Sequence, residues 1–366
     1  MMNNQEARTG SFEVKDAVQQ RVLHARRMSP AQARSVMDQI MNGGATPAQV
    51  GAFLVALRVL EPGVDEIVAF VNTMKEHAFR ISPRVTGRLV DTCGTGGDAF
   101  KTINISTLAA LVAAAAGLPV AKHGNRGVTS PCGSADLLEA FGVNVMAEPG
   151  VVEEAIGTTG IGFMFAPVFH PAMKHVVVPR REIGIRTVFN VLGPLTNPAG
   201  AKAHVMGVFD TSIMDMMARV LKETGVEHFF IVHAALGADE LLPCGKNDVI
   251  SMIDGDIELL QLAAADFGLE ERPVDSFVTP SSVDGMIRES VDMLNGRGPP
   301  PLVDAVAMNA AAALHVGGKV GDLPSATVMA REVLESGATI ETLERLVIAS
   351  GGDTGRFERV TRGRAT

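Results

Sequence analysis

Apolar positions follow a helical spacing through the first 80 residues. Val50, Phe53, Leu54 and Leu57 succeed one another at intervals of three and four, which is typical of the buried face of a helix. A Ser or Thr followed by Pro is a typical helix start and occurs at residues 29–30 and 46–47. The pattern predicts helices at 14–26, 30–42, 47–60 and 63–77. Residues 1–80 therefore form a small all-helical domain with no cluster of catalytic residue types.

From Arg88 onward, short apolar runs alternate with longer helical patterns, which predicts a parallel sheet flanked by helices. We assign residues 81–351 to this larger α/β domain. The expected strands are Leu89–Asp91, Pro119–Lys122, Val143–Met146, Gly162–Phe165, His204–Phe209 and Phe229–His233, with a further β-region at 249–260. Later helices are expected at 284–294, 302–315, 326–336 and 340–349. The basic, Gly- and Thr-rich segment 352–366 is expected to be frayed.

Composition narrows the function classes. The chain has 366 residues with 46% hydrophobic and 20% charged content, as in soluble globular proteins. The net charge of −9 gives no sequence-wide attraction to nucleic acid. No apolar run approaches the ~20 residues of a membrane helix. Three widely spaced cysteines without a secretion signal favour a reducing, cytoplasmic setting.

The first candidate site is the glycine-rich stretch 91–98, Asp-Thr-Cys-Gly-Thr-Gly-Gly-Asp. It follows a short apolar run and precedes Asn104-Ile105-Ser106-Thr107, where an Ala-rich helix begins. Glycines let backbone N–H groups approach a phosphate closely, and a helix start adds unpaired N–H groups and partial positive charge. The alternative is a tight turn in a parallel sheet, since glycines alone do not distinguish the two.

Two further stretches extend this pattern. Residues 122–126, Lys-His-Gly-Asn-Arg, follow another apolar run and precede Thr129, Ser130 and Ser134 at a helix start. Residues 180–198 carry several arginines and end in Gly-Pro-Leu-Thr-Asn-Pro. The two cations of the second loop suit phosphate oxygens because their charges are opposite. Their position also favours this role, since α/β proteins place ligands at the carboxyl ends of strands. The alternative for Lys122 and Arg126 is a solvated pair at a sheet edge.

Together these stretches closely resemble the anthranilate phosphoribosyltransferase family, in its order and spacing, from about residue 28 to 351. The resemblance implies a fold of the nucleoside phosphorylase/phosphoribosyltransferase type. It implies transfer of the phosphoribosyl group of 5-phosphoribosyl 1-pyrophosphate (PRPP) to anthranilate, the second step of tryptophan synthesis from chorismate. It also implies that part of 170–200 completes the helical domain and that this domain forms the contact of a homodimer.

The resemblance assigns the substrate contacts residue by residue. The PRPP contacts of the first loop and helix start are Gly94, Gly97, Asp98, Thr102, Asn104, Ile105, Ser106 and Thr107. Those of the second loop are Lys122, His123, Gly124, Asn125, Arg126, Gly127, Val128, Thr129, Ser130 and Ser134. The anthranilate contacts are Gly94, Asn125, His170 and Arg180. Arginine suits the acceptor carboxylate because its guanidinium donates two parallel hydrogen bonds. For His170 a purely structural hydrogen bond is the alternative.

The same resemblance assigns Mg²⁺, two ions per subunit, to Asp239, Glu240 and Ser106. Adjacent carboxylates repel unless a cation lies between them, and Mg²⁺ prefers oxygen ligands and phosphate. In isolation, an Asp-Glu pair is more often a solvated acidic turn. No residue stands out as a general base, which suits a dissociative transfer driven by positioning and electrostatics.

Some positions depart from the family pattern: Gly127 for Ser or Ala, Pro131 for Lys, and Leu241-Leu242 after the acidic pair. Three rivals remain open. One is a phosphoribosyltransferase of the same fold with another aromatic acceptor. A pyrimidine nucleoside phosphorylase is disfavoured because its lysine-bearing glycine loop is absent. A non-catalytic nucleic-acid-binding relative would need a basic groove and would lose the acidic pair.

Overall fold

The structure is a computed structural model that describes residues 12–97, 100, 103–127, 131–280 and 282–362. Its contacts divide the chain into two units. The helical unit contains the described residues up to His77 together with Pro171–Leu192. The α/β unit contains Ala78–His170 and the chain from Gly193 onward. The helical unit is therefore built from two separate parts of the sequence.

The helical unit has four N-terminal helices and a returning fifth. They are α1 (Val14–His24), α2 (Pro30–Met41), α3 (Pro47–Val59), α4 (Val64–Glu76) and α9 (Lys174–Ile183). The predicted starts are confirmed, since the hydroxyls of Ser29 and Thr46 accept hydrogen bonds from the N–H groups three residues later. Helix α9 packs against α3 and α2.

A buried ion pair joins α1 to α4. Arg21 Nη1 lies 2.5 Å from Glu66 Oε1, and both side chains are buried. The other nitrogen of the fork, Nη2, donates to the Leu60 carbonyl at 2.7 Å. Glu66 also accepts from the backbone N–H of Met28 and of Gly63. The carboxylate therefore connects α1, the α1–α2 connection and the start of α4.

Replacing Glu66 with alanine should destabilise the protein by about 3–5 kcal/mol, because it strands a buried guanidinium. Urea unfolding followed by circular dichroism measures the change. The matched control is Glu76→Ala, which removes an exposed partner of Arg34 in the same unit and should leave the midpoint almost unchanged. Equal midpoint shifts for the two variants would contradict the structural role given to Glu66.

The α/β unit is organised on a seven-stranded sheet in the order β3-β2-β1-β4-β5-β6-β7. The first five strands in this order pair in parallel, and β6 and β7 add an antiparallel hairpin. The predicted mostly parallel sheet is thus confirmed. The strands are β1 (Val90–Gly94), β2 (Val120–Gly124), β3 (Ile161–Phe165), β4 (Ala203–Gly207), β5 (His228–Ala234), β6 (Asn247–Ile253) and β7 (Asp256–Leu262).

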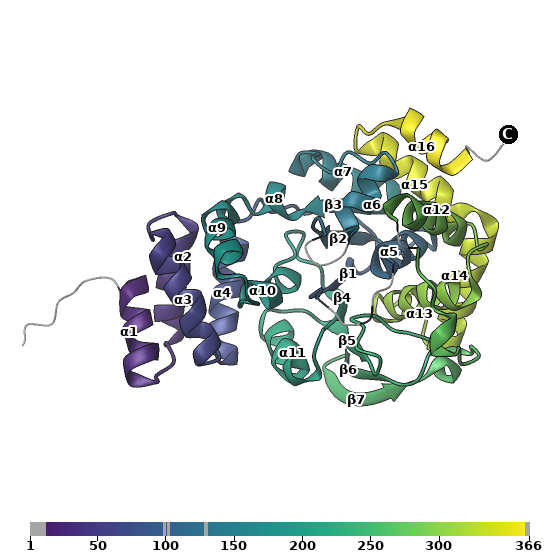
Figure 1. Cartoon of the computed structure of the whole chain (residues 1–366). Coiled ribbons are helices and arrows are strands. Elements are labelled where there is room, and N and C mark those ends of the chain that lie inside the picture. Colours follow the sequence, from purple (N-terminus) through teal and green to yellow (C-terminus); the bar gives the residue numbers. More distant parts are fainter. Residues whose placement is uncertain (1–11, 98–99, 101–102, 128–130, 281, 363–366) are drawn as a thin grey trace, which may run out of the picture. The chain divides into compact units, whose positions relative to one another are not determined.

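Helices cover both faces of this sheet. The buried helices α5 (Ile105–Ala115) and α13 (Pro300–Val316) pack on each other and on the central strands, and α11 (Met214–Glu223) packs on β5 from the other side (Figure 1). The remaining helices are α6 (Ser134–Ala140), α7 (Pro149–Thr159), α8 (Ala166–Phe169), α12 (Val283–Leu294), α14 (Leu323–Ser336), α15 (Ala338–Ala349) and α16 (Thr354–Arg362). Helix α10 (Phe189–Leu195) spans the sequence boundary between the two units, at residues 192 and 193. Among the described residues, none of the helices combines the length and apolar character needed to cross a bilayer.

Two sequence predictions are wrong. The segment 143–146 is not a strand, and β3 forms that edge of the sheet. Val143 and Val145 are buried in a turn, with the neighbouring Asn144 N–H donating to the Ser350 hydroxyl. The alternating apolar pattern arises there because Val143 and Val145 both enter the main hydrophobic core. They do not pair with a neighbouring strand.

The C-terminal tail is also not frayed over its described part, because it forms α16. Phe357 is fully buried in the main core, and Arg356 Nη1 donates to the Glu139 carbonyl at 3.1 Å. The Asp353 N–H donates to the Gly142 carbonyl at 2.7 Å. One apolar side chain and two hydrogen bonds therefore hold the tail against the region around α6.

Candidate active site

The strand order places a crevice beside β1. From β1 the chain adds β2 and β3 on one side, and it then adds β4 and β5 on the other, so the order in which strands are added reverses between β1 and β4. In such sheets ligands bind outside the carboxyl ends of the strands at this reversal. The glycine loop follows β1 at this point, and the segment carrying Asp239 and Glu240 follows the neighbouring β5.

The first glycine loop adopts a backbone that only glycine adopts readily. Gly96 and Gly97 have φ angles of +64° and +74°, in the left-handed region. The Gly96 N–H donates to Asp239 Oδ2 at 2.8 Å, and the Thr95 N–H donates to the Gly207 carbonyl at 3.0 Å. Two predicted contacts of this loop, Asp98 and Thr102, lie outside the described residues.

The proposed metal ligands converge in the α/β unit. Ser106, Asp239 and Glu240 all line one cavity of about 10 Å³, roughly the space of one water molecule. The Ser106 N–H donates to Glu240 Oε1 at 3.1 Å. A hydroxyl and two carboxylates form an all-oxygen donor set, which fits Mg²⁺. The solvated acidic turn left open by the sequence does not describe Glu240, which is buried.

The segment that follows the acidic pair is anchored by hydrogen bonds to α13 and by burial of its leucines. Asn309 of α13 accepts from the Leu241 N–H at 3.1 Å and donates to the Leu241 carbonyl at 2.8 Å. Leu241 and Leu242 are fully buried in the main core. The departure from the family pattern after the acidic pair therefore places two apolar side chains in the core and leaves the carboxylates at the cavity.

The second loop folds back on the start of α6. The Asn125 N–H donates to the Ser134 hydroxyl, and Asp136 accepts from the N–H groups of Gly127 and Gly133 at 2.8 and 2.9 Å. Asp136 is a residue that sequence reasoning missed, although its spacing from Gly133 is that of a helix-start carboxylate. The predicted contacts Val128, Thr129 and Ser130 lie outside the described residues.

The two cations of this loop have different surroundings. Arg126 is exposed and pairs with Asp136 and Glu139, which raises the pKa of its guanidinium. Lys122 is buried in β2, and its ammonium donates to the Thr92 carbonyl at 2.5 Å. The solvated pair considered from the sequence is therefore wrong for Lys122, which lies beneath the loops.

At the start of α5, two backbone N–H groups are already hydrogen-bonded to carbonyl groups of the protein. The Ile105 N–H bonds to the Ile103 carbonyl and the Thr107 N–H to the Asn104 carbonyl, while both side chains are buried. Asn104 Nδ2 donates to the Cys132 carbonyl at 2.8 Å and so connects the first loop with the second. Of this group, Ser106 is the residue that lines the cavity.

Two histidines of the α/β unit lie side by side. The rings of His123 and His170 have centroids 5.1 Å apart. Burial lowers the pKa of His123 well below its usual value, and burial lowers that of His170 to about 4. Both imidazoles are consequently neutral near pH 7. They provide uncharged ring surfaces and carry no cationic charge there.

Arg180 lies in α9 of the helical unit. Its guanidinium lies over the Phe189 ring, 5.6 Å from the centroid, and burial lowers its pKa. Among the described residues, no carboxylate lies within ion-pair distance of this side chain. A half-buried arginine without an acidic partner is a suitable receptor for a ligand carboxylate.

Comparison with known proteins defines the class. The profile described as "Glycosyl transferase family, a/b domain" matches residues 86–340, and "Glycosyl transferase family, helical bundle domain" matches residues 16–78. The chain therefore belongs to this glycosyl transferase family, and within it to the anthranilate phosphoribosyltransferases, for the following reasons.

Relatives with that name match almost the full length. The anthranilate phosphoribosyltransferase of Thioalkalivibrio sulfidiphilus is 47% identical over 87% of this chain and 94% of the relative. That of Methanopyrus kandleri is 45% identical over 90% and 98%. The crystal structure of the Thermus thermophilus enzyme has a TM-score of 0.85 at 42% identity, covering 92% of this chain and 99% of that one. The Saccharomyces cerevisiae enzyme in complex with PRPP and Mg has a TM-score of 0.84 at 26% identity, covering 92% and 98%.

Proposed function

We propose that this protein transfers the phosphoribosyl group of PRPP to anthranilate, giving N-(5-phosphoribosyl)anthranilate and pyrophosphate. The reaction breaks the bond between the ribose C1 and the pyrophosphate oxygen, and it forms a bond between C1 and the anthranilate nitrogen. The observation that carries the proposal is the convergence of Ser106, Asp239 and Glu240 next to the glycine loop. This donor set belongs at the pyrophosphate, which is the most highly charged part of the substrate.

The residues of the site contribute by positioning and charge. Bound Mg²⁺ would neutralise the charge that develops on the leaving pyrophosphate, and Ser106, Asp239 and Glu240 would hold it. Gly96 leaves open space for phosphate oxygens at the backbone, whereas the Asp239 carboxylate occupies the space beside Gly94. The start of α5 adds its partial positive charge. The anthranilate amine loses its proton after attack, and no side chain is assigned as its base.

The remaining assignments extend this proposal. We assign the PRPP contacts to the two loops as the sequence resemblance implies, with Asn125 and Ser134 at the second loop. His170 and Asn125 face the acceptor. For Lys122, burial within β2 favours a role through its charge, and one of its three N–H donors bonds to the Thr92 carbonyl.

We further propose two Mg²⁺ ions per subunit, a homodimer and a cytoplasmic setting. Relatives crystallised with PRPP and Mg and with 4-fluoroanthranilate support metal use and this acceptor class. Apolar side chains exposed on α1 and α3, among them Val22, Leu23 and Val59, support a dimer contact on the helical unit. Sedimentation equilibrium tests the dimer, and a monomer at micromolar concentration would contradict it.

An acceptor panel tests the reaction class. Pyrophosphate release from PRPP is measured with anthranilate, with aniline and with benzoate. The proposal expects efficient release with anthranilate alone, because the site recognises the amine and the carboxylate together. Faster turnover with an acceptor that lacks either group would favour the rival phosphoribosyltransferase of the same fold.

Replacing Arg180 with alanine should raise the Michaelis constant for anthranilate roughly tenfold or more, because a charged hydrogen bond is worth about 1.5–3 kcal/mol. The constant for PRPP should change much less. Arg180→Lys should restore part of the loss, since an ammonium cannot reproduce the fork. The matched control is Arg181→Ala, an exposed neighbour in the same helix. Steady-state kinetics varying each substrate separately decides the matter, and equal losses for both substrates would contradict the assignment.

A further inference from the structure

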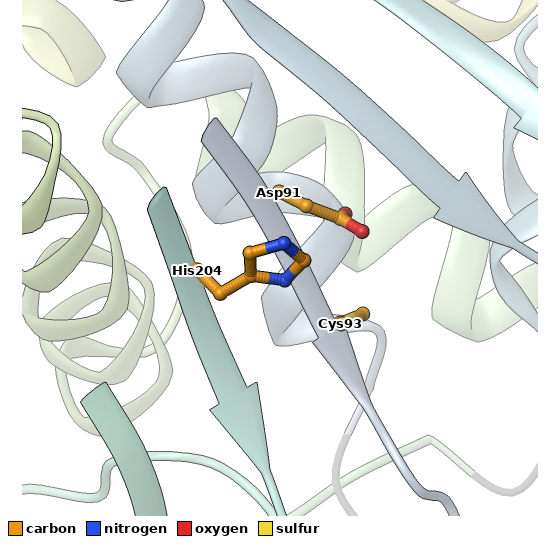
Figure 2. Close-up of side chains that lie close together, drawn as sticks. All are labelled: Asp91, Cys93 and His204. Carbon is orange, nitrogen blue, oxygen red and sulfur yellow. The ribbon is translucent and has the colours of Figure 1, made fainter. Parts of the chain in front are cut away.

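A buried polar cluster lies between β1 and β4, directly beneath the first glycine loop. Asp91 and Cys93 occupy the same face of β1, and His204 lies opposite Asp91 in the register of β4 (Figure 2). All three are buried, and their potential ligand atoms lie within 4.8 Å of one another. The three residues have the spacing of a transition-metal site. Their hydrogen bonds show whether the cluster is instead a network that connects segments of the protein.

Both oxygens of the Asp91 carboxylate accept hydrogen bonds from the protein. Oδ1 accepts from the His123 N–H at 3.2 Å, and Oδ2 accepts from Asn197 Nδ2 at 2.7 Å. The ammonium of Lys122 lies close enough to interact with this carboxylate electrostatically. Burial also raises the pKa of the Cys93 thiol well above its usual value, which disfavours the thiolate that a metal requires. Burial lowers the pKa of the Lys122 ammonium, and the negative charge of Asp91 opposes that shift, so the two groups interact without a metal.

These bonds connect three segments that lead into the proposed substrate site. Asp91 precedes Gly94 by three residues on β1. His123 lies on β2, two residues before Asn125 of the second loop. Asn197 belongs to the Gly-Pro-Leu-Thr-Asn-Pro stretch and also donates to the Ala121 carbonyl at 2.9 Å. The rigid β1 and β2 backbones transmit the position of Asp91 to both glycine loops, and a shift of about 1 Å at a reacting centre costs rate.

We propose that Asp91 is a positioning residue for the phosphoribosyl transfer proposed above, holding the two substrate loops and the 193–198 segment in register through His123 and Asn197. It touches neither substrate. It acts by fixing the backbone from which Gly94 and Asn125 project.

The protonation state of Asp91 provides an independent signature. Burial raises its pKa to about 6, while the charge of Lys122 and the bonds from Asn197 and His123 oppose that rise. The other ionisable groups facing it are Cys93 and His204. The charged form accepts both hydrogen bonds, so it predominates above pH 6 and is lost as the pH falls through that value. Wild-type turnover should therefore decline below pH 6, and Asp91→Asn should lack that step.

The test compares Asp91→Asn, Asn197→Ala and the double variant. We expect Asp91→Asn to lower kcat at least tenfold and to weaken PRPP binding in calorimetry. Asn197→Ala keeps the Asp91 carboxylate and its hydrogen bond from the His123 N–H, and so remains informative if the first variant folds poorly. Because both act through one network, the double variant should be no slower than Asp91→Asn. Multiplying effects on kcat would overturn the proposal.

The matched control is Asp304→Asn. Asp304 is equally buried and pairs with Arg272 and Arg331 elsewhere in the α/β unit. It should lose thermal stability while keeping kcat and both Michaelis constants. An Asp91→Asn variant that loses stability but retains wild-type kcat and PRPP affinity would overturn the positioning role.

Two further readouts separate the alternatives. Metal analysis of the purified protein should find less than one transition-metal ion per chain, and a stoichiometric ion that Asp91→Asn loses would overturn the proposal in favour of a metal site. PRPP affinity does not depend on the acceptor. If wild-type protein bound PRPP but did not consume anthranilate, the proposed function would fail, and calorimetry of Asp91→Asn would still decide the role of Asp91.

Discussion

Changing both Asp239 and Glu240 to alanine should reduce turnover by roughly 10²-fold or more, the scale of losing preorganised charge stabilisation in a transition state. The two carboxylates line the same cavity as Ser106, and Asp239 also fixes the Gly96 amide. Without them the pyrophosphate would leave with its charge uncompensated. The fold should persist, because the hydrogen bonds with Asn309 that anchor this segment use the backbone of Leu241. Alanine at positions 239 and 240 leaves those bonds in place.

The measurement is kcat over a Mg²⁺ titration, with the thermal midpoint recorded for each protein. Glu270 and Glu271 provide a matched control, since they are also adjacent acidic residues but are exposed. Alanine at both of those positions removes the same charge and should leave kcat unchanged. A double variant at 239 and 240 that kept full activity in EDTA would contradict the metal assignment.

The second large effect is expected at Gly97. Its φ of +74° is unfavourable for any side chain with a Cβ, and a valine there would also place methyl groups beside the backbone that approaches phosphate. Losing one or two charged hydrogen bonds, each worth about 1.5–3 kcal/mol, should weaken PRPP binding by roughly tenfold to 10⁴-fold.

Calorimetric titration of PRPP into Gly97→Val measures this loss. Gly87→Val is the matched control, because Gly87 has a φ of +91° and lies before β1, away from the loop that follows the strand. The Gly87→Val variant has the same kind of backbone strain but leaves the first glycine loop unchanged. Unchanged PRPP affinity in Gly97→Val would show that the stretch is only a turn.

The sequence predicted the architecture because its signals are local. Short apolar runs ended by glycine loops identify β1 and β2, and Ser-Pro and Thr-Pro identify the starts of α2 and α3. It failed where burial depends on distant partners. Val143 and Val145 alternate like a strand but are buried beside a turn bonded to Ser350. Phe357 organises a helix at the end of the chain by entering the main core.

The candidate site was only partly predictable for the same reason. An isolated Asp-Glu pair is ambiguous, and only its approach to Ser106, some 130 residues away, gives it a function. Lys122 was correctly predicted in a strand, but its burial in β2 was not predictable, and the alternative of a solvated position is wrong. Asp91 was passed over, yet a carboxylate inside a buried strand is itself a signal, because it requires partners that the sequence does not name.

Anthranilate fluorescence followed during incubation with PRPP tests the central claim most directly. The proposed function predicts that fluorescence falls only when protein, PRPP and Mg²⁺ are all present, and that excess EDTA stops the decline. One pyrophosphate should appear for each anthranilate consumed. Stable fluorescence with folded protein and both substrates in Mg²⁺ would contradict the proposed function.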